Sequence, residues 1–132
     1  MKVHHVGYFV KNIEKSLKTF MSLGYEVEQE TVRDEYRGID ITFLMKDGYR
    51  VELVSPYTQE SVVYDLRKKM GNSPYHICYE VDNLDKAIEE LQEQRFVVSQ
   101  EPHEAVAIEG KRVCFLVHGQ IGIIELVEVE NK

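Results

Sequence analysis

The strongest constraint on the fold of this chain is an internal repeat. The stretch VHHVGYFVKNIEKSLKTF at 3–20 matches PYHICYEVDNLDKAIEEL at 74–91, so the two copies lie 71 residues apart (74 − 3). The match places His5 on His76. A repeat of this size predicts that one supersecondary unit occurs twice, with equivalent positions meeting near a pseudo-twofold axis.

The residue pattern of the first copy predicts a β-α-β-β-β unit. A helix is expected between Asn12, whose side chain can cap it, and Gly24, which fits the left-handed position after its end. Asp47-Gly48 is a tight-turn signal between the last two strands. Runs rich in β-branched and aromatic residues predict four strands. We expect these strands at 2–10, 25–32, 39–45 and 49–55.

The second copy predicts the same order of elements. Its helix is expected at 84–94, capped by Asn83 or Asp82, and a short amphipathic helix at 60–70 connects the copies. Its strands are expected at 75–81, 95–100, 111–117 and 121–129. We therefore predict an α+β fold that consists of two tandem β-α-β-β-β modules.

No linker is expected to divide the chain, because no segment is low in complexity or rich in Pro, Gly and Ser. The 132 residues suffice for one domain with a hydrophobic core. We expect a single domain over 1–132, with module 1 at about 1–56, a connector at about 57–72 and module 2 at about 73–132.

Composition narrows the classes of function. The net charge of −7 disfavours a nucleic-acid partner, because an acidic surface repels phosphate. No apolar run approaches the ~20 residues of a membrane span, and the first ten residues are too polar for a signal peptide. Cys78 and Cys114 lie in apolar segments, where we expect free buried thiols. These features favour a cytoplasmic protein that does not bind membranes.

Each copy has one histidine on its first predicted strand and one glutamate on its last. His5 and Glu52 are 47 residues apart (52 − 5), and His76 and Glu125 are 49 apart (125 − 76). Taken singly, such residues are usually a hydrogen-bonded core histidine and an edge or surface glutamate. Brought together by the repeat, two buried carboxylates repel each other, and a divalent cation removes that conflict. The donor set suits Zn, Ni, Co, Mn or Fe, and we predict one such ion.

Paired modules with this His and Glu pattern resemble the vicinal oxygen chelate (glyoxalase/bleomycin resistance/dioxygenase) superfamily. The resemblance covers nearly the whole chain and implies an open, cup-shaped mixed sheet around one metal ion. It implies four ligands, His5 in HHVGYFV, Glu52 in YRVELVSP, His76 in YHICYEVDN and Glu125 in GIIELVE. Within the superfamily, the stretch at 52–83 resembles the connector of methylmalonyl-CoA epimerases.

The chain departs from these epimerases in loops that border the substrate in the family. Tyr75-His76 replaces two adjacent histidines, and Val117-His118-Gly119 replaces a His-Pro-Lys turn. These departures bear on the identity of the substrate more than on the predicted metal ligands.

The resemblance implies a metal-dependent isomerase that moves a proton next to a carbonyl, of the epimerase type on an acyl-CoA or similar thioester. Glu125 would be both a ligand and a base. Asp40, in GIDITFL, resembles the position of a catalytic carboxylate in some epimerases, and fits a structural place at a strand entry equally well. His103 and His118 are expected in solvated loops.

Two other functions stay open. A glyoxalase I-type lactoylglutathione lyase, which isomerises a thiohemiacetal adduct, needs the same four ligands. A non-catalytic small-molecule binding or resistance protein needs none of them. A dioxygenase site with two histidines and one glutamate leaves Glu52 unexplained. By the same resemblance we expect a homodimer.

Overall fold

The computed structural model describes residues 1–130, so the last two residues of the predicted module 2 lie outside the described residues. The chain divides into two compact units. The N-terminal unit is His5–Tyr75, and the C-terminal unit comprises Met1–His4 and the chain from His76 onward. No helix among the described residues is long and apolar enough to cross a membrane.

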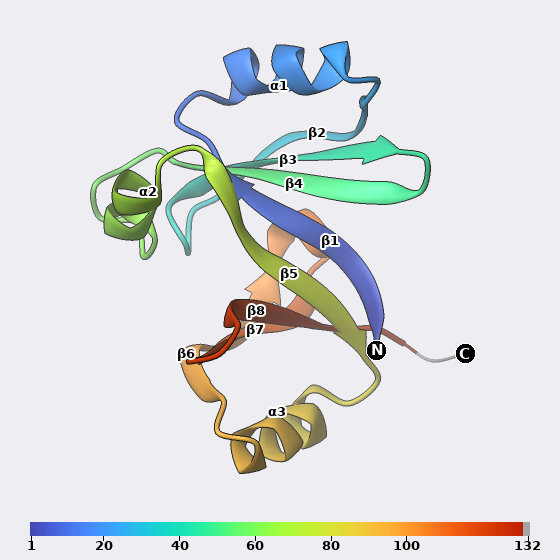
Figure 1. Cartoon of the computed structure of the whole chain (residues 1–132), viewed down its shortest axis with the longest axis vertical. Coiled ribbons are helices and arrows are strands. Elements are labelled where there is room, and N and C mark those ends of the chain that lie inside the picture. The colour runs from blue at the N-terminus through green and yellow to red at the C-terminus, as the bar shows by residue number, and fades with distance from the viewer. Residues whose placement is uncertain (131–132) are drawn as a thin grey trace. The chain divides into compact units, whose positions relative to one another are not determined.

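The N-terminal unit contains most of the first predicted module (Figure 1). Its strands follow the order β2-β3-β4-β1, in which β1 pairs parallel with β4 and the other pairs are antiparallel. The elements are β1 (Lys2–Phe9), α1 (Ile13–Ser22), β2 (Glu26–Asp34), β3 (Ile39–Lys46), β4 (Tyr49–Pro56) and the connector helix α2 (Tyr64–Met70).

The C-terminal unit repeats this arrangement. Its strand order is β5-β8-β7-β6, again with one parallel pair, β5 with β8. The elements are β5 (Ser73–Val81), α3 (Leu84–Glu93), β6 (Val97–Ala105), the 3-10 turn η1 (Val106–Ile108), β7 (Lys111–His118) and β8 (Gly122–Glu128). The predicted α+β fold of two β-α-β-β-β modules is confirmed.

Both module helices begin at the asparagine that the repeat aligns. The side chain of Asn12 accepts a hydrogen bond from the Lys15 amide at 2.9 Å, and Asn83 accepts from the Lys86 amide at 3.0 Å. Each cap satisfies one of the backbone donors that a helix start leaves without a partner. Of the two candidate caps of α3, Asn83 rather than Asp82 is the residue used.

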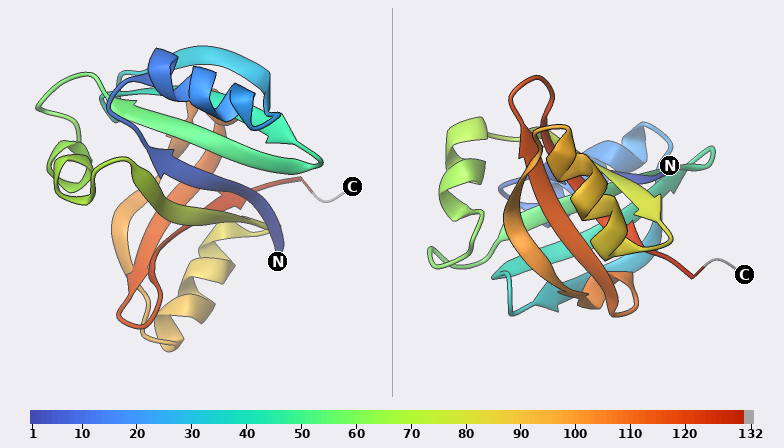
Figure 2. Two further views of the ribbon diagram at one scale, coloured as in Figure 1. Left: turned by 45° about the horizontal axis from the view of Figure 1, so that its top comes forward. Right: turned by 90° about the horizontal axis from the view of Figure 1, so that it is seen from below.

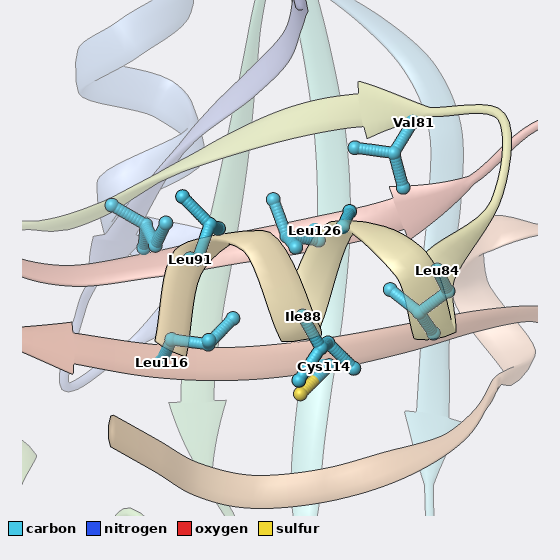
Figure 3. Packing of buried hydrophobic residues seen from close by; sticks show 9 residues of the cluster. Val81, Leu84, Ile88, Leu91, Cys114, Leu116 and Leu126 are labelled. Atoms are coloured by element: carbon cyan, nitrogen blue, oxygen red, sulfur yellow. The ribbon is translucent and has the colours of Figure 1, made fainter. Parts of the chain in front are cut away.

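The two module helices, α1 and α3, each lie on the sheet of their own unit, as the two views of Figure 2 show. In the C-terminal unit, the buried face of α3 contacts residues of β7 and β8 (Figure 3). Burying a leucine or isoleucine side chain contributes ~1.5–3 kcal/mol, so this face fixes α3 on its sheet. The cluster includes Leu84, Ile88, Leu91, Cys114, Leu116 and Leu126.

The predicted turn at Asp47-Gly48 is also confirmed. Both residues have positive φ angles, 51° and 83°, and the flanking Lys46 and Tyr49 are paired in the ladder. Two successive positive φ angles match the twist of the flanking strands, which explains the Asp-Gly pair. Gly24 follows α1 with a φ of 99°, as its place after the helix predicts.

Two predictions about element bounds were wrong. β6 extends to Ala105, well past residue 100, because its second part pairs with β7 across a register shift between Gln100 and His103. Pro102 lies in that irregular part, where the missing amide costs no regular ladder bond. α2 begins at Tyr64 rather than at residue 60. Two histidines that had been expected in loops lie in strands. His103 lies in the extended part of β6, and His118 is the last residue of β7.

Candidate metal centre

The first histidine–glutamate pair is formed within the N-terminal unit. β1 and β4 run parallel with Gly7 opposite Glu52, so His5, two residues before Gly7, points to the same face as Glu52. Nε2 of His5 lies 3.4 Å from Oε1 of Glu52. The two side chains are only 0% and 7% exposed, so the pair is withdrawn from water.

The second pair has the same construction within the C-terminal unit. β5 and β8 run parallel with Cys78 opposite Glu125, so His76 shares the face of Glu125. Nε2 of His76 lies 3.0 Å from Oε1 of Glu125. The side chains are 0% and 5% exposed. Each predicted ligand is therefore buried beside the partner that the repeat assigns to it.

The geometry of each pair fits two ligands of one divalent ion. Ligand atoms held at the usual distance of about 2.1 Å lie ~3.0 Å apart at a right angle and ~3.4 Å apart at a tetrahedral angle. The two observed separations are 3.0 and 3.4 Å. Imidazole nitrogen and carboxylate oxygen are also a donor set that Zn²⁺ and its neighbours accept.

A phenylalanine flanks each pair. The ring of Phe43 meets that of His5 edge-on at 5.3 Å between centroids, and Phe115 meets His76 in the same way at 5.1 Å. Neither phenylalanine was predicted to belong to the site. The signal was present, because TFLM at 42–45 matches CFLV at 114–117 with a spacing of 72 residues (114 − 42).

Asp40 lies on the other face of β3. The register sets Phe43 opposite Glu52 and Thr42 opposite Leu53, so Asp40 shares the face of Thr42 and not that of Glu52. Its two carboxylate oxygens accept hydrogen bonds from Arg33 at 2.9 and 3.1 Å. This contact raises the pKa of the Arg33 guanidinium. Within its unit, the structure does not bring Asp40 together with His5 and Glu52.

His118 makes two hydrogen bonds, both at the exposed surface. Its Nε2 lies 3.1 Å from the carbonyl oxygen of Gln94, just after α3, and its Nδ1 accepts from the Gln120 amide at 3.0 Å. The ring also contacts Phe96. His118 therefore ties the β7–β8 turn to the end of the helix. Nδ1 of His103 lies 2.9 Å from the carbonyl oxygen of Glu104.

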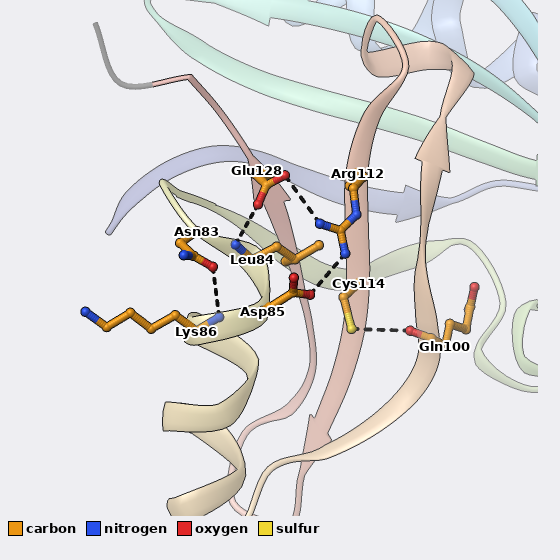
Figure 4. A network of polar contacts seen from close by, with 8 residues as sticks. All are labelled: Asn83, Leu84, Asp85, Lys86, Gln100, Arg112, Cys114 and Glu128. Carbon is orange, nitrogen blue, oxygen red and sulfur yellow. Dashed lines mark hydrogen bonds and ion pairs between the residues drawn. The ribbon is translucent and has the colours of Figure 1, made fainter.

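Arg112 belongs to a structural network (Figure 4). Its guanidinium contacts Asp85 at 3.0 Å and Glu128 at 3.6 Å. Glu128 in turn accepts from the amide of Leu84 at 2.8 Å, which adds a second acceptor at the start of α3. The network links α3, β7 and β8.

Both cysteines are free and buried, as predicted. The thiol of Cys114 donates to the carbonyl oxygen of Gln100 at 3.4 Å (Figure 4). Burial raises the pKa of this thiol to about 11, and the charge of Glu101 adds to the effect. A thiol in this state is a weak nucleophile at neutral pH.

Comparison with known proteins agrees with the two-module fold. The family model described as Glyoxalase/Bleomycin resistance protein/Dioxygenase superfamily matches residues 4–115. Mitochondrial methylmalonyl-CoA epimerase of Bos taurus is 29% identical in sequence to this chain. The alignment covers 98% of this chain and 74% of the relative. Ethylmalonyl-CoA/methylmalonyl-CoA epimerase of Cereibacter sphaeroides is 29% identical, covering 87% of each chain. The crystal structure of methylmalonyl-CoA epimerase from Mycobacterium tuberculosis has a TM-score of 0.83 at 23% identity, covering 98% of this chain and 89% of that one.

Proposed function

Because the chain belongs to the Glyoxalase/Bleomycin resistance protein/Dioxygenase superfamily, we propose that it is a divalent-metal-dependent enzyme of the epimerase type. Its substrate would be an acyl-CoA or a similar acyl thioester with an acidic C–H next to the carbonyl. Support for this substrate class comes from relatives named methylmalonyl-CoA epimerase that align with nearly the whole chain.

The observation that supports the metal site best is the repetition of one buried histidine–glutamate pair. His5 with Glu52 and His76 with Glu125 occupy equivalent strands, and each pair has the atom separation that two metal ligands require. Two equivalent pairs from one repeat suit a single ion, as the sequence pattern predicts. We propose one ion per chain from the set Zn, Ni, Co, Mn or Fe.

The reaction would be a proton transfer. When bound, the ion supplies Lewis acidity for the negative charge that develops on a carbonyl oxygen. Glu125 would take the proton from the α-carbon, and the C–H electron pair would move into the carbonyl group. Return of a proton to the opposite face completes an epimerisation. Because both histidine–glutamate pairs are buried, the protein around them would limit the access of water to the reacting carbon.

Asp40 does not receive a role in this proposal. Its carboxylate is paired with Arg33 on the face of β3 that does not hold Glu52. We assign it to stabilising the entry of β3, and leave the second acid or base unassigned.

The first experiment is metal stoichiometry by mass spectrometry after reloading the dialysed protein with each divalent ion. The wild type should hold about one ion per chain, and His76→Ala and Glu125→Gln should lose it, because each removes a ligand. His103→Ala is the control variant, because it removes a histidine that is not among the four predicted ligands. A wild type that takes up no ion would overturn the metal site and favour a binding protein.

The second experiment tests the substrate class. With methylmalonyl-CoA in D₂O, the loaded enzyme should incorporate deuterium at the α-carbon, which NMR detects. Isomerisation of methylglyoxal with a thiol, without exchange on the thioester, would instead identify a glyoxalase I-type lyase.

We also propose a cytoplasmic homodimer. The two buried free thiols need no oxidising compartment, and paired modules of this family often dimerise. Light scattering of the purified protein tests the oligomeric state.

A further inference from the structure

We infer that Phe43 and Phe115 are positioning residues that hold His5 and His76 against their glutamates and thereby set the metal affinity of the site. This inference rests on the proposed metal centre and extends it to residues that cannot bind a metal themselves. It concerns two contacts, each of which lies within one unit.

The first argument is the repeated geometry. Phe43 contacts His5 at 5.3 Å between ring centroids with an interplanar angle of 77°, and Phe115 contacts His76 at 5.1 Å and 87°. The same edge-on contact therefore occurs in both copies of the repeat. A single aromatic neighbour beside a buried histidine is common in protein cores. Two in equivalent positions, each beside a predicted ligand, indicate a shared role.

The second argument is the register of the strands. Phe43 on β3 lies directly opposite Glu52 on β4, and Phe115 on β7 lies directly opposite Glu125 on β8. Residues opposite each other in an antiparallel pair have neighbouring side chains on one face of the sheet. Each phenylalanine thus flanks both members of its histidine–glutamate pair.

Neither phenylalanine belongs to the hydrophobic core under the helix of its unit. Leu44 and Leu116, the next residues along each strand, belong to the clusters that pack against α1 and α3. Because side chains alternate along a strand, Phe43 and Phe115 point to the opposite face. Their burial, 2% and 8% exposed, is therefore on the side of the sheet that holds the histidine–glutamate pairs.

These contacts have two physical consequences. A ring packed against the imidazole restricts its rotation, so Nε2 stays directed at the carboxylate. An apolar wall beside the carboxylate excludes water and lowers the local dielectric, which strengthens its attraction to a cation. Both effects should tighten metal binding without adding a ligand.

The test compares Phe43→Leu and Phe115→Leu with Leu44→Val and Leu116→Val, which alter the other face of the same strands. Zinc affinity is measured by competition with a chromogenic chelator. We expect the phenylalanine variants to bind Zn²⁺ about tenfold more weakly, within the range found for groups that orient ligands. The leucine variants should stay within about twofold of the wild type. Equal affinities in all four variants would overturn the inference.

A second readout uses the metal-free protein and therefore does not depend on the proposed function. Imidazole ¹⁵N shifts of His5 and His76 should report one ordered tautomer in the wild type. Phe43→Leu should average the signals of His5 and leave those of His76 unchanged, and Phe115→Leu should do the reverse. Unchanged histidine signals in both variants would overturn the positioning role. A wild type with ordered signals and no zinc binding would overturn the metal centre and the effect on metal affinity, and would leave the positioning of the histidines intact.

Discussion

The two copies of the repeat hold equivalent His, Glu and Phe side chains but stabilise the sheet around them differently. In the N-terminal unit, the β2–β3 turn contains a buried ion pair, with Arg37 Nη1 2.8 Å from Asp34 Oδ2. In the C-terminal unit, buried Ala105 occupies the position of Asp34 (34 + 71), and the following turn contains buried Ile108 in place of an ion pair. The site geometry therefore follows from strand register, which both copies share, and tolerates either kind of turn.

The two module helices also differ in how much apolar surface they bury. α3 buries four residues against its sheet, whereas none of the residues of α1 is fully buried. Ile13, Leu17 and Phe20 of α1 pack on their sheet and remain partly exposed. Because buried apolar area stabilises in proportion to its extent, α3 should contribute more to stability than α1. The N-terminal unit has a buried ion pair where the other unit has apolar packing.

The largest expected effect comes from breaking that ion pair. Asp34→Ala should lower the free energy of unfolding by ~3–5 kcal/mol, because it leaves the charge of Arg37 buried without Asp34. The double variant Asp34→Ala/Arg37→Ile replaces both charges of the pair with apolar residues and should lose less stability, because no buried charge of the pair then remains. Urea denaturation measures both. Equal losses in the single and double variants would show that the ion pair is not what distinguishes the two turns.

A matched pair of helix variants sharpens the comparison of α3 with α1. Leu84 is fully buried, and its repeat equivalent Ile13 (84 − 71) is only partly so. Leu84→Ala should cost ~3 kcal/mol, and Ile13→Ala ~1–1.5 kcal/mol, because a partly exposed side chain leaves a smaller cavity. Thermal and urea unfolding give both values. A larger loss for Ile13→Ala would contradict the difference in burial.

Much of this organisation was predictable because local signals and the repeat pointed to the same elements. Asn12, Gly24 and the Asp47-Gly48 turn lie where their conformational preferences predict. The four candidate ligands were predictable because a strand position fixes the face on which a side chain lies. Their pairing within each unit then depended only on strand order.

The rest depended on contacts that a sequence does not display. α2 begins later in the chain than predicted. The hydroxyl of Ser61 donates a hydrogen bond to the carbonyl oxygen of Arg37 at 2.7 Å, which holds the residues before α2 against the β2–β3 turn. His118 looked like a loop residue, but its two hydrogen bonds join segments on either side of it. Asp40 lies on the opposite face from Glu52, and that distinction requires the register of β3 on β4.

The pH dependence of Cys114 tests a smaller difference between the copies. Its repeat equivalent is Thr42 (114 − 72), which shares a 2.6 Å hydrogen bond with Thr31 and cannot ionise in this range. Burial raises the pKa of Cys114 to about 11 from an ordinary 9.0, so the unfolded state loses its proton first. The contribution of this thiol to stability is complete below pH 9.0 and is lost as the pH rises towards about 11.

The measurement is urea stability at several pH values between neutral and about 11, for the wild type and Cys114→Thr. The wild type should lose stability relative to the variant above pH 9.0. In a Cys78→Ala background, alkylation of Cys114 by iodoacetamide at pH 9 should be at least ~50-fold slower in the native than in the denatured protein, because the thiolate is scarce. Parallel pH profiles for the two proteins would contradict the raised pKa.

The smallest expected effect concerns the residue that follows each helix. Gly24 has a φ of 99°, and Arg95, its repeat equivalent (95 − 71), has a φ of 72° in the same left-handed region. A residue with a Cβ atom is strained there by ~1–2 kcal/mol, and glycine is not. Arg95→Gly should therefore raise the free energy of unfolding by ~0.5–1 kcal/mol, since the gain is partly offset by the freer unfolded chain.

The reciprocal variant Gly24→Ala should be destabilising by ~1–2 kcal/mol for the same reason. An added Cβ at Gly24 would also lie 3.1 Å from Cε of Lys46, a contact that this flexible side chain can relieve by moving. Changes of opposite sign in the two variants, measured by urea denaturation, would show that both copies use the same left-handed helix end. A loss of stability in Arg95→Gly would mean instead that the Arg95 side chain stabilises the C-terminal unit by more than its backbone strain costs.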